Sequence, residues 1–73
     1  MAINVEAHIT GTIRQVRKQK GDMVSAGDVL LVIESMKMQM PLEVEEGGRV
    51  DAIQVRIGQP VSEGDVVAVL TAS

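Results

Sequence analysis

Cysteine and all three aromatic residue types are absent from this chain of 73 residues. Without cysteine there is no disulfide framework and no thiolate metal site, and one histidine, His8, cannot form a histidine-based site. Without aromatic side chains the chain lacks platforms on which nucleic-acid bases stack. The formal net charge of −3 leaves no basic surface for a phosphate backbone. Metal centres and nucleic-acid partners are therefore not expected.

Long apolar runs are also absent. A membrane-spanning helix needs about 20 consecutive apolar residues, and residues 1–16 lack the apolar core of a signal peptide. We therefore expect one cytoplasmic domain over residues 1–73, monomeric in isolation and without a membrane partner. A domain of this size buries only about 60% of the surface that its unfolded chain exposes.

Branched aliphatic residues dominate the apolar content. The chain has 12 Val, 6 Ile and 4 Leu, so 18 of these 22 side chains are β-branched. Such side chains are stiff at the first torsion angle and fit a pleated surface better than a helix. Seven glycines and two prolines divide the chain into short segments. The composition predicts an all-β fold.

The sequence repeats itself at an offset of 37 residues. Two copies are too few for a solenoid, so we predict two half-repeats, residues 11–35 and 48–72, packed face to face about a pseudo-twofold axis. The architecture expected is a flattened β-barrel or sandwich. The identical pairs are Gly11/Gly48, Gly21/Gly58, Val24/Val61, Ser25/Ser62, Gly27/Gly64, Asp28/Asp65, Val29/Val66 and Val32/Val69.

Each half-repeat has the same internal pattern of strands and turns. Residues 29–33 and 66–70 are continuous apolar runs bounded by turn signals, which is typical of buried strands. Residues 12–16 alternate loosely, and the first strand is expected at 3–7. Residues 28–40 also fit a helical face, but their β-branched content and the shorter copy at 65–70 favour a strand. Structural turns are expected at Gly21, Gly27, Gly58 and Gly64.

Lys37 is the central residue, with 36 residues on either side. A twofold relation places it near the axis, so the linking hairpin, residues 34–40, should carry Lys37 at or near its tip. No Gly, Asn or Asp lies between Glu34 and Met40, although tight hairpin turns favour them. A departure from local turn chemistry is a place to look for function. The bland interpretation makes Met36, Met38 and Met40 inward-facing gap fillers and Lys37 a solvated charge.

The motif E-S-M-K-M at 34–38, the segment G-D-M-V-S-A-G-D-V-L at 21–30 and the second half-repeat resemble the biotinyl domain. This domain is the biotin carboxyl carrier module of biotin-dependent carboxylases. The resemblance covers residues 5–71 and is strongest to single-domain biotin/lipoyl attachment proteins and to the C-terminal modules of acyl-CoA carboxylases. It implies a barrel-sandwich hybrid fold.

The resemblance also implies a function. Biotin would be attached covalently to Lys37 by a biotin protein ligase, carboxylated at a biotin carboxylase site and used at a carboxyltransferase site. Glu34, Ser35, Met36 and Met38 would serve recognition by the ligase and by these partners. The chain would be a carrier with no catalytic residue of its own. A lysine side chain is almost wholly protonated near neutral pH, so the ligase must supply the base.

Three alternatives remain at this stage. A lipoyl carrier shares the architecture, but that resemblance calls for Asp where Met36 stands. An unmodified adaptor would keep the fold without any attached group. An independent enzyme is disfavoured because the sequence shows no acid–base pair, activated nucleophile or phosphate loop. The Ala-Pro segments of many biotinyl domains and the protruding thumb of some carriers are also missing here.

Overall fold

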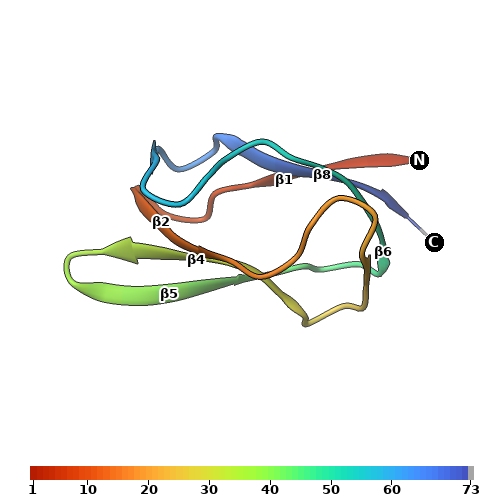
Figure 1. Cartoon of the computed structure of the whole chain (residues 1–73), viewed down its shortest axis with the longest axis horizontal. Helices are drawn as coiled ribbons and strands as arrows, with labels where there is room; N and C mark the ends of the chain where they lie inside the picture. Colours follow the sequence, from red (N-terminus) through yellow and green to blue (C-terminus); the bar gives the residue numbers. More distant parts are fainter. Residues whose placement is uncertain (73) are drawn as a thin grey trace.

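The computed structural model describes residues 1–72 and consists of two four-stranded antiparallel sheets (Figure 1). The first sheet has the order β1 (Ala2–Glu6), β8 (Val66–Ala72), β6 (Gly48–Ile53) and β3 (Met23–Val24). The second has the order β5 (Met38–Glu43), β4 (Val29–Ser35), β2 (Gly11–Val16) and β7 (Pro60–Val61). The all-β prediction is confirmed, and the segment that also fitted a helix forms two strands.

Strands 37 residues apart occupy matching places in the two sheets. β1 corresponds to β5, β8 to β4, β6 to β2 and β3 to β7. The two-residue strands are exchanged, because β3 pairs with β6 and β7 pairs with β2. Each sheet therefore contains strands from both parts of the chain. The repeated segments interlock, which is more than the face-to-face packing that the sequence indicated.

The core between the sheets is aliphatic. Most of its branched side chains come from β2, β4, β6 and β8, and in β4 four consecutive residues, Leu30, Leu31, Val32 and Ile33, are buried. Among residues 1–72 no polar or charged residue is buried. Burying such side chains contributes about 1.5–3 kcal/mol each, which suits a domain with no disulfide. The largest fully buried side chains are Ile13, Leu30, Leu31, Ile33, Val50, Val67 and Leu70.

An aspartate closes each of the matching tight turns. The carboxylate of Asp28 accepts a hydrogen bond from Ser25 N–H, and that of Asp65 accepts one from Ser62 N–H, both at 2.8 Å. Gly27 adopts φ +92°, a left-handed conformation that glycine tolerates because it has no Cβ. Gly64, in the matching turn, has φ +94°.

The chain ends lie together, opposite the β4–β5 hairpin (Figure 1). The N–H of Ala72 donates to the carbonyl of Met1 at 3.0 Å. β1 begins and ends one residue before the predicted range 3–7, and β4 and β8 extend two residues beyond theirs. Within the described part of the chain, no helix is long and apolar enough to cross a membrane.

Candidate functional site

The β4–β5 hairpin turns through only two residues, Met36 and Lys37. Ser35 pairs with Met38 directly below them. Met36 has φ 53° and Lys37 has φ 65°, which is the pattern of a type I′ turn. Among residues 1–72 these are the only non-glycine residues with positive φ. The left-handed conformation costs such a residue about 1–2 kcal/mol, so the strands below hold the turn against local preference.

The methionines on either side of Lys37 face outward. Met36 is 92% exposed and Met38 is 61% exposed, while Met40 is only partly buried. The interpretation of Met36 and Met38 as core fillers is therefore wrong. An exposed methionine presents a flexible, polarisable thioether to whatever docks there. Lys37 is exposed between the two thioethers.

Glu34 forms an ion pair away from Lys37. Its Oε1 lies 3.7 Å from Nε of Arg14, and its side chain is 36% exposed. Arg14 sits at a bulge in β2, where the register with β4 shifts between Ile13 and Gln15. In residues 1–72 no carboxylate lies within ion-pair distance of Lys37. Within the described residues, the Lys37 side chain therefore has no carboxylate partner.

The matching position at the other end of the molecule holds a different pair. The Thr71 hydroxyl donates to the carboxylate of Asp51, and Nη2 of Arg49 lies 3.3 Å from it. The hydrogen bond from Thr71, and then Arg49, lower the pKa of Asp51 against the opposing effect of partial burial. Asp51 and Thr71 correspond to Arg14 and Glu34 at the offset of 37. The two equivalent positions therefore share a backbone arrangement but carry different side-chain pairs, an arginine–glutamate ion pair in one sheet and an aspartate–threonine hydrogen bond in the other.

The hairpin can present an amine but brings no catalytic group beside it. Among the described residues there is no group of three His, Cys, Asp or Glu side chains that could hold a metal ion. His8, exposed in the segment after β1, lies outside the hairpin. The turn glycines Gly21, Gly27, Gly58 and Gly64 also lie outside the hairpin and shape the scaffold. Glu34, Ser35, Met36 and Met38, by contrast, surround Lys37 on one hairpin.

Sequence reasoning missed two residues that support this hairpin. Gly11 packs so closely against Glu34 that a Cβ there would overlap its carbonyl oxygen. Arg14 supplies the partner of the Glu34 carboxylate. The identity of Gly11 and Gly48 in the repeat could have indicated that Gly11 has a structural role. Nothing in the sequence pattern pointed to Arg14.

Two interlocked β-sheets with an exposed lysine on a two-residue hairpin turn define an attachment domain of the biotin/lipoyl type. The family model described as "Biotin-requiring enzyme" matches residues 1–70. This chain belongs to the biotin/lipoyl attachment family.

Relatives and a solved structure agree with this assignment. The chain is 37% identical to the "Biotinylated protein TB7.3 homolog" of Mycobacterium leprae over 71 residues, which is 97% of this chain and 100% of that protein. It is 31% identical to the "Biotin/lipoyl attachment protein" of Bacillus subtilis over 71 residues, 97% of each chain. A single-chain, multi-domain long-chain acyl-CoA carboxylase contains a similar fold, with a TM-score of 0.93 and 33% identity. That match covers 99% of this chain and 7% of the carboxylase.

Proposed function

We propose that this chain is a biotin carboxyl carrier and that Lys37 is its attachment residue. The observation that carries the proposal is the exposed lysine in a left-handed two-residue turn, flanked by the exposed Met36 and Met38. Its similarity to a biotinylated protein and to a biotin/lipoyl attachment protein supports the same function.

The lysine fits an amide linkage to biotin. Nζ of Lys37 would attack the carbonyl carbon of biotinyl-adenylate, forming the C–N bond as the bond to the adenylate oxygen breaks. The ammonium group must lose protons for this step, and no carboxylate among residues 1–72 lies within ion-pair distance to accept one. The biotin protein ligase therefore supplies the base. The exposed turn can enter the ligase pocket without unfolding any strand.

After attachment the chain acts by delivery. Biotin supplies the atom that carries a carboxyl group between a biotin carboxylase site and a carboxyltransferase site. The domain keeps that atom at a high effective concentration near both sites, and the partner enzymes perform the chemistry. It is therefore a non-catalytic component of a biotin-dependent carboxylase. The similar fold within a multi-domain acyl-CoA carboxylase supports this role.

Met36 and Met38 would form the contact surface for these successive partners. Thioether side chains adapt to differently shaped apolar surfaces, and this hairpin must be accepted by a ligase and by two enzyme sites. Ser35 pairs with Met38, and Glu34 lies one pair further down, where Arg14 holds its side chain. They would contribute to recognition by the ligase.

Intact mass after co-expression with a biotin protein ligase tests the proposal. We expect a gain of one biotin less one water in the wild-type chain and none in Lys37→Ala, whose circular dichroism spectrum and Tm should stay unchanged. A second control, Lys20→Ala, removes an exposed lysine outside the hairpin and should still be labelled. No gain in mass would contradict the proposal. A mass gain equal to lipoate less one water would show that the attached group is lipoate and not biotin. Labelling of Lys37→Ala would show that Lys37 is not the attachment residue.

A further inference from the structure

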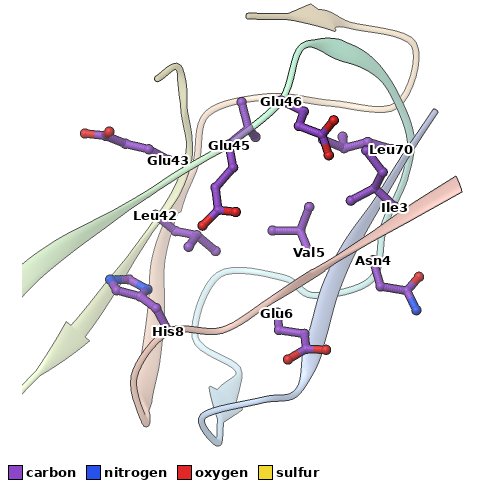
Figure 2. A pocket seen from close by; sticks show the side chains of 11 residues that line it. Ile3, Asn4, Val5, Glu6, His8, Leu42, Glu43, Glu45, Glu46 and Leu70 are labelled. Atoms are coloured by element: carbon purple, nitrogen blue, oxygen red, sulfur yellow. The ribbon is translucent and has the colours of Figure 1, made fainter. Parts of the chain in front are cut away.

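A groove of about 300 Å³ lies on one side of the molecule, away from the turn that holds Lys37. It runs between β1 and the segment 42–46, which contains the end of β5 and the residues after it (Figure 2). We call it the β1–β5 groove. Five of the residues that line it are aliphatic: Ile3, Val5, Leu42, Val44 and Leu70.

The groove has a negative rim. Four glutamates line it together with His8, and among residues 1–72 no lysine or arginine does. Among residues 1–72 none of these four carboxylates takes part in an ion pair, since the two ion pairs present use Glu34 and Asp51. In Figure 2 the side chains of Glu45 and Glu46 extend over the groove, whereas Glu43 points away from it. The remaining glutamate is Glu6, on β1.

Both strands beside the groove are edge strands. In the part of the chain that the structure describes, β1 pairs only with β8, and β5 pairs only with β4. Each therefore has one side whose backbone N–H and C=O groups have no partner strand. Such an edge can accept an added strand from another chain, with affinity from main-chain hydrogen bonds and specificity from pockets for alternate side chains.

We propose that the β1–β5 groove binds an extended segment of a partner protein in which apolar residues alternate with lysine or arginine. Alternation places the apolar side chains on one face of an extended segment, where they would fill the groove above Val5 and Leu42. The basic side chains would then meet Glu45 and Glu46 at the rim. Opposite charges steer such an encounter and fix its register.

The charge of the rim argues against a second copy of this chain as the occupant. Two copies joined through this groove would bring their Glu45 and Glu46 carboxylates together, and like charges at close range repel. A basic segment neutralises them instead. We therefore expect the occupant to be positively charged, whereas this domain has a net charge of −3.

An occupied groove would leave Lys37 accessible. Leu42 lies four residues along β5 from Met38, which is about 13 Å at the rise of a β-strand. A partner could therefore hold the domain by the groove while the hairpin turn visits other sites. This surface does not depend on what is attached to Lys37.

Titration followed by ¹H–¹⁵N NMR tests the proposal, with the acetylated peptide Lys-Val-Arg-Leu-Lys-Val-Arg as probe. We expect amide shifts concentrated in β1 and residues 42–46, and affinity that falls as salt screens the rim. The double variant Glu45→Gln/Glu46→Gln should bind about two- to thirtyfold more weakly, since each of two exposed ion pairs is worth about 0.2–1 kcal/mol. Glu63→Gln is the matched control, because Glu63 is exposed in the turn before β8 and does not line the groove.

Two further peptides separate this groove from general charge attraction. A version with glutamate in place of each basic residue, and one with serine in place of each apolar residue, should both fail to bind. Lys37→Ala should bind the basic peptide as the wild type does, which keeps this test separate from that of biotin attachment. The proposal is overturned by absent shifts, by equal losses in Glu63→Gln, by equal binding of the serine peptide, or by shifts spread evenly over the acidic surface.

Discussion

Gly11 lies directly against the backbone carbonyl of Glu34, and a side chain on Gly11 would overlap that oxygen. The contact joins the start of β2 to the strand that leads into the Met36–Lys37 turn. Gly48 makes the same contact with the carbonyl of Thr71 at the other end of the molecule. The position of the hairpin thus depends on the absence of a side chain at Gly11, although Gly11 belongs to β2 and the hairpin is formed by β4 and β5.

Gly11→Ala should destabilise the fold by about 1–3 kcal/mol, the usual cost of forcing extra atoms into a packed site. The blocking atom is backbone, so it cannot move aside as a flexible side chain would. Urea denaturation followed by circular dichroism measures the change. Ala2→Gly serves as a control at an exposed position of β1, and a midpoint for Gly11→Ala equal to that of the wild type would contradict the close approach.

Gly27→Val and Gly64→Val should each lower stability by about 1–2 kcal/mol for a different reason. No atom lies within 4 Å of a Cβ built at either position, but φ is +92° and +94°, and β-branched residues resist this region. Thermal melts give the comparison. Ala26→Val, exposed in the same turn, should shift stability by no more than about 0.5 kcal/mol. Unchanged melting in both glycine variants would show that the turns tolerate a side chain.

Met36→Asp should raise stability while weakening biotin attachment. Aspartate accepts positive φ more readily than methionine, so the variant should gain up to about 1 kcal/mol by relief of the turn. Loss of the thioether should slow ligase labelling by about fivefold or more, as for a significant interface residue. Met38→Asp is the control, since it removes a thioether without relieving the turn and should slow labelling with no gain in Tm. Labelling of Met36→Asp at the wild-type rate would remove the methionines from the recognition surface.

Asp51 should make stability depend on pH in a defined direction. Its pKa is lowered in the folded state, mainly by the Thr71 hydroxyl, so its contribution is present above the unfolded value of about 3.9 and is lost as pH falls through the folded value. Thr71→Val removes the main cause. The Tm difference between wild type and Thr71→Val should be full near pH 6 and shrink towards pH 3.

Thr12→Val provides the control for that series. Thr12 is a partly buried strand threonine, and within residues 1–72 its side chain makes no hydrogen bond. Its Tm difference from the wild type should not vary with pH in the same way. A pH-independent difference for Thr71→Val would mean that the hydroxyl does not act through the Asp51 charge.

The strands and the hairpin could be predicted because their signals are local. The apolar runs at 29–33 and 66–70 and the offset of 37 residues require no knowledge of distant partners. The exchange of β3 and β7 could not be predicted, since two residues are too few to show a period. Their partners are set by long-range hydrogen bonds, such as Gly21 N–H to the Val50 carbonyl at 2.7 Å.

The same distinction applies to the site. Lys37 stands out by its central position and by the lack of turn-forming residues around it. The outward direction of Met36 and Met38 does not follow from spacing, because alternation alone fits an inward or an outward face. The Arg14–Glu34 pair and the β1–β5 groove arise only when strands distant in sequence come together.

The adjacency of the chain ends has a mechanical consequence. The molecule measures 34 × 18 × 17 Å, with the termini at one end of the long axis and the Met36–Lys37 turn at the other (Figure 1). A linker joined to either end would pivot the whole domain from a single point. The domain would then move as a rigid unit and add its length of 34 Å to the distance that the linker can reach. A short tether would therefore let Lys37 sweep a far wider arc than the same linker with a lysine at its own tip.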